Sequence, residues 1–177
     1  MNMSILDWLR NARPTDAKGH GDTDTVRRIV GELDRVDPSL ARYLAAFAYM
    51  LSRVASADLG VSDVESEKMT EIVRRLGQLS DEQSVLVVEL AKTQNRLFGG
   101  TEDFLVAREF RAIATDVQRH QMLDCLFAVA AADDEVSAEE EGQIRQIASE
   151  LGFSHTDYVA ARMAYSDKRS VFRRERQ

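Results

Sequence analysis

One stretch of this chain occurs twice, and the duplication limits the possible folds more than any other feature. Residues 51–77 align with residues 126–152, and 11 of the 27 aligned positions are identical. Helical periodicity explains shared apolar residues, but it does not require shared polar ones. The repeated polar residues are Asp58/Asp133, Ser62/Ser137 and Glu65/Glu140. The chain is therefore predicted to use one unit twice: an apolar helix, an acidic turn and a second helix.

The composition predicts a helical protein. Hydrophobic residues make up 44% of the 177 residues and aromatic residues only 7%. The only two prolines are Pro14 and Pro38, so no proline interrupts a helix in residues 39–177. We therefore predict an all-α fold, a single compact bundle of about seven to eight helices built from two pseudo-repeated helix-turn-helix halves.

The chain divides into three parts. Residues 1–22 are predicted to form a short amphipathic N-terminal segment and a flexible linker, because Pro14 and two glycines follow a short apolar stretch. The helical domain should span residues 23–165, with repeats at about 40–79 and 115–154. Residues 166–177 are basic with little apolar content and form a tail.

Capping residues locate several helix ends. An N-cap side chain accepts a hydrogen bond from the first turn, and a polar residue three positions later reaches back to it. The predicted starts are Asp37 before Pro38, Ser62 with Glu65, Ser80 with Gln83, Thr101, Ser137 with Glu140, and Ser154 with Asp157. The first helix of the second repeat should cover about residues 117–132. Helices should end at Gly77, Gly99–Gly100 and Gly152.

Charge and cysteine content exclude several functions. The net charge of −7 disfavours nucleic acid as a partner, because such proteins need a basic face. Cys125 is the only cysteine, which rules out an internal disulfide, and its apolar surroundings predict a buried, inert thiol. The longest weakly charged stretch, residues 43–57, contains Arg53 and is too short to span a bilayer. No secretory signal is recognisable, so a cytoplasmic protein is expected.

The acidic turns have two interpretations. In the structural one, the Ser and Glu of each turn form a capping box that joins two helices. In the functional one, the turn oxygens bind a hard divalent cation such as Ca²⁺ or Mg²⁺, although no EF-hand spacing is present. The candidate ligands are Asp58, Glu65, Asp133, Asp134 and Glu140. The chain therefore has either no cofactor or Ca²⁺/Mg²⁺ at these turns.

No enzyme signature occurs. The three histidines lie apart from the acidic turns, and there is no phosphate-binding loop or nucleophile elbow. A hydrolase that uses the clustered carboxylates is disfavoured, because no base, nucleophile or oxyanion donor can be assigned. We expect a non-enzymatic protein that binds protein partners of unknown identity. Residues 3–10 either pack back on the domain or contact a membrane surface or a partner.

The second acidic turn resembles a known family. The string Ala-Asp-Asp-Glu-Val-Ser-Ala-Glu-Glu at residues 132–140, followed by Leu-Gly-Phe at residues 151–153, is similar to the turn of the tellurite-resistance TerB-like family. The short apolar start with Leu6 and Trp8 is similar too. The resemblance covers about residues 24–165.

This resemblance implies an all-helical domain with two pseudo-repeated halves and no established enzymatic activity. It also implies a bacterial protein of stress response or tellurite resistance, cytoplasmic or at the inner face of the membrane, with proposed metal sensing. The alternative is a purely structural protein-interaction module, a co-chaperone or membrane-associated scaffold, whose acidic turns are only helix caps. The family's acidic positions correspond to Asp58, Glu65, Asp133 and Glu140. The chain departs from the family where a glycine follows the Asp: it has Leu59 in the first copy and Asp134 in the second. Leu disfavours the left-handed backbone that glycine permits, so a reshaped first turn is expected.

Overall fold

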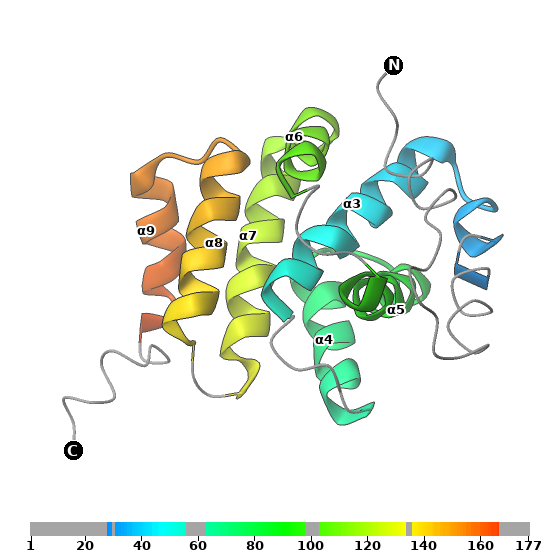
Figure 1. Cartoon of the computed structure of the whole chain (residues 1–177), viewed down its shortest axis with the longest axis horizontal. Helices are drawn as coiled ribbons and strands as arrows, with labels where there is room; N and C mark the ends of the chain where they lie inside the picture. The colour runs from blue at the N-terminus through cyan, green and yellow to red at the C-terminus, as the bar shows by residue number, and fades with distance from the viewer. Residues whose placement is uncertain (1–27, 30, 56–62, 98–102, 134–135, 167–177) are drawn as a thin grey trace.

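The computed structural model describes residues 28–29, 31–55, 63–97, 103–133 and 136–166. Within these ranges the regular elements are all helices, so the predicted all-α class is confirmed (Figure 1). They are α3 (Pro38–Val54), α4 (Asp63–Leu76), α5 (Asp81–Leu97), α6 (Asp103–Ile113), α7 (Asp116–Ala130), the 3₁₀ turn η2 (Ala131–Asp133), α8 (Ala138–Glu150) and α9 (His155–Met163). None of the described helices has the length and apolar character needed to cross a membrane. The predicted N-terminal segment and linker, the caps at Ser62 and Thr101, the Gly99–Gly100 stop and tail residues 167–177 lie outside the described ranges.

Helix α3 is the central element of the bundle. It packs against α5, α6, α7 and α8, and most of its residues are buried. Figure 1 shows α3 running obliquely past α7, while α7, α8 and α9 lie side by side. Ala45, Ala46 and Ala48 are fully buried, and their small side chains let neighbouring helices approach closely. A helix that is apolar on nearly all sides is stable only when other elements cover it, and α5, α6, α7 and α8 pack against α3 in this way.

The two halves share one core. Helix α4, which follows the first acidic turn, packs against α5 and α7. The rings of Tyr43 and Phe110 stack at 5.5 Å between centroids, and Phe47 meets both rings edge-on. These aromatic contacts join α3 of the first half to α6. The sulfur of Cys125 is buried, as predicted, and burial raises the pKa of this thiol to about 12.

Most of the predicted helix starts within the described ranges are confirmed. Asp37 accepts hydrogen bonds from two backbone N–H groups at the start of α3, and Pro38 occupies the first helical position. Ser137 and Ser154 form capping boxes at α8 and α9, and Ser80 exchanges the same pair of bonds with Gln83. The start of α7 differs from the prediction, because Thr115 forms a capping box with Gln118 and the helix runs over Asp116–Ala130 instead of 117–132.

The two repeated glycines occupy different conformations. Gly152 has a φ of 83°, and Phe153 N–H donates to the Ala148 carbonyl, so this helix ends in a Schellman motif. In the first copy the left-handed residue is Gln78, with a φ of 54°. Gly77 provides close packing instead, since a Cβ there would lie 2.5 Å from the Val73 carbonyl oxygen. Glycine is therefore needed for the left-handed backbone in the second copy and for close packing in the first.

A buried ionic network connects three helices. The Arg53 side chain on α3 is only 4% exposed and lies 3.3 Å from an oxygen of Asp103 on α6 and 2.6 Å from an oxygen of Glu150 on α8. Asp103 also accepts a hydrogen bond from the Tyr49 hydroxyl at 2.9 Å, and Glu150 accepts one from Gln146 at 3.0 Å. Each carboxylate therefore has partners in addition to the arginine, as a buried charge requires.

Candidate functional site

The five predicted cation ligands are only partly within the described residues. Asp58 and Asp134 lie outside them, and Asp133 ends η2 with its side chain outside them. Glu65 lies in the first turn of α4 and Glu140 in the first turn of α8. A cation site that joins these side chains stays a prediction.

Glu140 is used as a helix cap. One of its carboxylate oxygens accepts hydrogen bonds from the backbone N–H of Ser137 at 2.8 Å and from the Ser137 hydroxyl at 2.7 Å. The Glu140 N–H in turn donates to the Ser137 hydroxyl. Among the residues that the structure describes, no three Asp, Glu, His or Cys side chains are grouped so that they could hold a metal ion. The geometry at Glu140 agrees with the structural interpretation of this turn.

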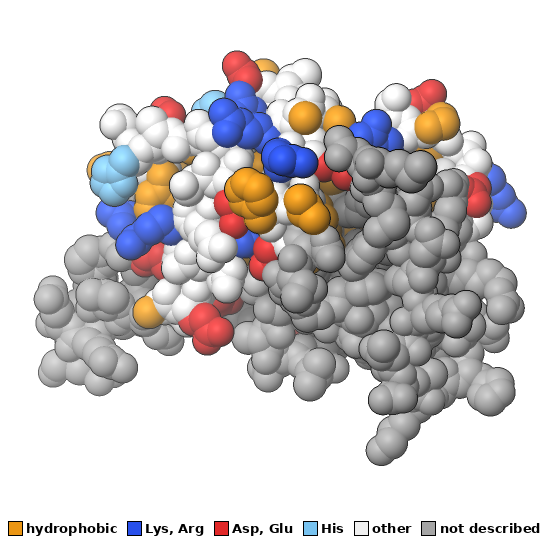
Figure 2. Space-filling view, turned by 45° about the horizontal axis from the view of Figure 1, so that its top comes forward, with side chains coloured by type: hydrophobic (Ala, Val, Ile, Leu, Met, Phe, Trp, Pro, Cys, Tyr) orange, Lys and Arg blue, Asp and Glu red, His pale blue; other side chains and the backbone are white. Residues whose placement is uncertain are grey.

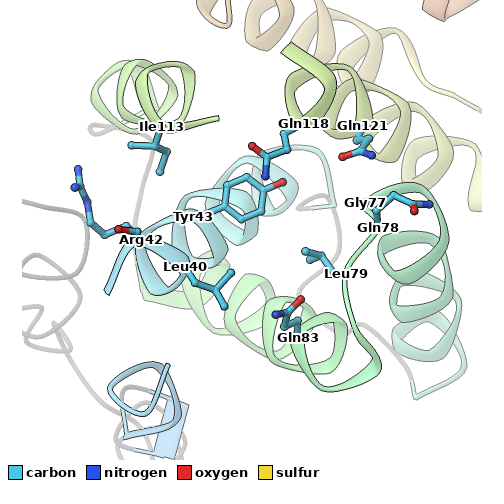
Figure 3. Close-up of a pocket in the computed structure, with 11 residues that line it drawn as sticks. Leu40, Arg42, Tyr43, Gly77, Gln78, Leu79, Gln83, Ile113, Gln118 and Gln121 are labelled. Atoms are coloured by element: carbon cyan, nitrogen blue, oxygen red, sulfur yellow. The ribbon is translucent and has the colours of Figure 1, made fainter. Parts of the chain in front are cut away.

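A pocket lies between α3, α5, α6 and α7 and the turn that joins α4 to α5 (Figure 3). Its volume is about 630 Å³, which is within the range of small-ligand sites. Four glutamines and three aliphatic side chains dominate its walls. The lining residues are Ser39, Leu40, Arg42, Tyr43, Gly77, Gln78, Leu79, Gln83, Ile113, Gln118 and Gln121.

Tyr43 is the most informative residue of this pocket. Its ring is held by the stacking contact with Phe110 and the edge contact with Phe47, so the direction of its hydroxyl is fixed. Figure 3 shows the ring in the middle of the labelled side chains, with Gln118 and Gln121 on one side and Leu79 on the other. Tyr43 is 7% exposed, and its hydroxyl has no hydrogen-bond partner within the described part of the chain.

The Tyr43 hydroxyl is a permanent hydrogen-bond donor. Burial, with a smaller contribution from nearby Cys125, raises the pKa of Tyr43 well above its usual value of 10. The hydroxyl therefore keeps its proton at any physiological pH. A buried hydroxyl without a partner costs about 1–3 kcal/mol. Such a group is uncommon in a native structure and calls for an explanation.

The pocket amides are oriented by hydrogen bonds at its edge. The Gln118 side-chain oxygen accepts from the Thr115 N–H at 2.8 Å, and the Gln83 oxygen accepts from the Ser80 N–H at 3.1 Å. In both side chains the NH₂ group is left as a donor. Gln78 differs, since its NH₂ donates to the Arg75 carbonyl at 2.8 Å and its amide is directed away from the Tyr43 ring (Figure 3).

The pocket carries little net charge. Arg42 is the one ionisable lining residue apart from Tyr43, and its guanidinium donates two hydrogen bonds to one oxygen of Glu109, at 3.0 and 2.9 Å. The Glu109 carboxylate offsets the arginine charge at the rim. An ion would therefore find no uncompensated opposite charge among these lining residues.

The family model described as "Tellurite resistance protein TerB" matches residues 44–163 of this chain. The chain belongs to the TerB family. The all-helical fold implied by the sequence resemblance is the fold that the structure has. No curated protein and no solved structure matches the chain significantly.

Some of the residues that line the pocket lie inside the TerB match and others lie outside it. Gly77, Gln78, Leu79, Gln83, Ile113, Gln118 and Gln121 lie inside residues 44–163, whereas the α3 residues that line the pocket, Ser39, Leu40, Arg42 and Tyr43, precede residue 44. Three of the four chain segments that line the pocket therefore lie inside the TerB match, and the fourth, which contains Tyr43, precedes it in the sequence.

This pocket could not be predicted from the sequence. Its residues come from four separate segments, and none of them belongs to a known motif. The one sequence signal is the spacing of Gln118 and Gln121, which puts two amides on one face of α7. In the sequence Tyr43 is one of several apolar residues of its helix, and nothing there indicates that its hydroxyl has no hydrogen-bond partner in the described residues.

Proposed function

We propose that this TerB-family protein is a non-enzymatic binding domain, acting in a stress-response or tellurite-resistance assembly, and that the Tyr43 pocket is its contact with a protein partner. The observation that carries the proposal is a pocket of about 630 Å³ bordered by the Tyr43 ring, whose buried hydroxyl has no partner in the described residues. A ligand atom can pair with this hydroxyl only if the side chains that cover it move aside, and pairing would then remove the cost of leaving it unsatisfied.

The chemistry of the pocket favours binding over catalysis. Its lining groups are amides, aliphatic side chains, two hydroxyls and an arginine that is paired with Glu109. An amide is neither an effective general acid nor an effective general base near neutral pH, and the raised pKa of Tyr43 keeps its hydroxyl protonated, so it cannot act as a base. Ser39 lines the pocket without the adjacent base that a nucleophilic serine needs among the lining residues.

Exposed apolar side chains on α6 also support the proposal that the protein binds a protein partner. Phe104 is 61% exposed and Leu105 is 50% exposed, both in the first turn of α6. Figure 2 shows hydrophobic side chains beside Lys and Arg side chains near the middle of one face. Apolar side chains grouped on a surface are typical of protein contacts.

A cation at the acidic turns is kept as the alternative mode of regulation. In that case Ca²⁺ or Mg²⁺ would bind at Asp133, Asp134 and Glu140, with Asp58 and Glu65 as the first-copy ligands, and would change partner affinity. The cap at Glu140 argues against it, because a carboxylate oxygen with two hydrogen bonds is less available to a metal. A membrane contact by residues 3–10 is a further hypothesis.

Affinity capture with immobilised full-length protein tests the proposal. Gln121→Arg should block the pocket and release any partner that wild type retains. Gln143→Arg is the matched control, since Gln143 is a partly buried glutamine on α8 that does not line the pocket. The proposal is wrong if both variants retain the same proteins as wild type.

A further inference from the structure

One side of helix α6 is exposed and combines apolar with basic side chains. The other side is buried in the core, which fixes the direction of the exposed one. Four exposed residues form the α6 face: Phe104, Leu105, Arg108 and Arg111. Arg108 is three or four positions from each of the other three, so it adjoins all of them on the helix surface. Figure 2 shows a face of the molecule on which exposed hydrophobic side chains adjoin Lys and Arg side chains.

The two arginines of the α6 face have no ion pair with any residue in the described part of the chain. Helix α6 also contains two acidic residues, but arginines of α3 engage both: Asp103 at 3.3 Å and Glu109 at 2.9 Å. No acidic residue lies three or four positions from Arg108 or Arg111, where a helix would bring it into contact. The two arginines are themselves three positions apart, so their like charges repel each other. An anionic partner would remove this repulsion.

The apolar members of the α6 face are open to water. Phe104 is 61% exposed and its neighbour Leu105 is 50% exposed. Covering both with apolar groups is favourable, because it removes their surface from water. Arg111 is held in place, since a Cβ at Gly152 would lie 2.6 Å from its guanidinium carbon and the side chain therefore lies against the turn between α8 and α9. Aromatic residues and arginine are the residue types enriched in protein interfaces.

We infer that the α6 face binds an acidic amphipathic helix of a partner protein, whose carboxylates pair with Arg108 and Arg111 and whose apolar side chains cover Phe104 and Leu105. Three residues of α6 rise about 4.5 Å. Carboxylates three or four residues apart on a helix that lies alongside α6 therefore match the two guanidinium groups. None of the four residues lines the Tyr43 pocket, so the inference concerns a second surface and does not depend on the proposed function.

Charge also decides between an acidic helix and an anionic membrane. Basic segments that bind membranes typically contain about four to eight Lys or Arg residues. The α6 face contributes only Arg108 and Arg111, on a chain whose net charge is −7. The rest of the protein therefore opposes attraction to an anionic bilayer, which would contact a broad area of its surface. A helix contacts a single stripe and needs only these two arginines.

Fluorescence anisotropy with purified full-length protein tests the inference. The probe is a fluorescein-labelled peptide of three copies of the heptad Glu-Leu-Ala-Gln-Glu-Leu-Ala, which places the glutamates on one stripe of a helix and the leucines on the next. We expect saturable binding with a Kd on the order of 0.1 mM, weakened by high salt. The same peptide with glutamine in place of every glutamate should bind about tenfold more weakly, because it keeps the leucines and loses the charges.

Variants of the α6 face identify the contact. The double variant Arg108→Gln with Arg111→Gln should weaken the peptide about tenfold, and Phe104→Ala should do the same by removing apolar surface. The matched control is Arg74→Gln with Arg75→Gln, which removes the same charge from exposed positions on α4 and should leave the affinity unchanged. If circular dichroism shows that the α6 double variant is not folded, Arg108→Gln alone replaces it and should weaken binding about threefold.

Three results of the peptide assay overturn the inference: no saturable binding up to about 2 mM peptide, equal binding of the glutamine peptide, or equal affinities of the α6 and α4 double variants. Arginine-dependent binding to phosphatidylserine vesicles without binding of the peptide also overturns it and assigns the face to a membrane. Gln121→Arg, which blocks the Tyr43 pocket, should leave the peptide affinity unchanged, and a loss of affinity would contradict a separate surface. Failure of the pocket proposal and failure of this inference are therefore distinguishable.

Discussion

Replacing Arg53 with Met should cost more stability than replacing any surface arginine of this protein. The guanidinium is 4% exposed and holds two carboxylates: Glu150, whose side chain is 10% exposed, and Asp103, whose side chain is 25% exposed. In Arg53→Met the Glu150 charge stays buried without its closest cation. Breaking one partner of a buried pair costs about 3–5 kcal/mol. Asp103 adds less, because it is more exposed and still accepts from Tyr49.

Urea unfolding followed by circular dichroism measures this loss as a lower midpoint at an unchanged slope. The double variant Arg53→Met with Glu150→Leu should recover most of it, because an apolar pair of similar volume replaces the ion pair. Arg74→Met is the control: this arginine pairs with Glu71 on the surface at 45% exposure, and its loss should leave the midpoint near that of wild type. The reasoning is refuted if Arg53→Met costs less than about 1 kcal/mol, or if the double variant is no more stable than the single one.

Three further predictions concern packing, the thiol and the acidic turns. Gly77→Ala should lower the free energy of unfolding by about 1–3 kcal/mol, since its Cβ would lie 2.5 Å from the Val73 carbonyl; a midpoint equal to wild type would contradict this. The pKa of Cys125 is raised in the folded state to about 12, so the folded thiol binds its proton more tightly than the unfolded one. Stability should therefore fall as the pH rises from about 9 towards 12, and iodoacetamide should label unfolded but not folded protein at pH 8.5; equal labelling of both states would contradict it. Titration of metal-stripped protein with Ca²⁺ or Mg²⁺ should give saturable NMR shifts around residues 133–140 that Asp133→Asn abolishes if the cation hypothesis holds, and no saturable shift if the turns are only caps.

Local sequence signals predicted the helices well. Ser137 with Glu140, Ser154 with Asp157 and Asp37 with Pro38 are caps whose partners lie within four residues, so sequence spacing alone defines the geometry. The burial of Cys125 was predicted for a similar reason, because an apolar run on a helix in a small protein has few alternatives to the core. The Thr115 cap was missed because the predicted helix began at residue 117, although Gln118 has the required spacing.

Long-range features could not be predicted in the same way. Arg53 interrupts an apolar helix, and the sequence does not indicate that its partners lie at Asp103 and Glu150. The pocket also depends on residues that are distant in the sequence, because α7 supplies the Gln118 and Gln121 side chains that line it together with Tyr43. Both repeated glycines lie at helix ends, as predicted, but the repeat does not indicate their conformations. Gly152 has the left-handed backbone, whereas Gly77 packs closely on Phe47 and the left-handed residue is Gln78.

The central place of α3 also determines how this protein must be made. Residues 38–54 leave the ribosome before α6, α7 and α8, which cover much of their apolar surface. The Phe47 ring lacks its contact with Phe110 until residue 110 has emerged, and Arg53 lacks Glu150 until residue 150 has emerged. The nascent chain therefore leaves part of its most hydrophobic helix uncovered until α8 has been made, and the core can close only after that.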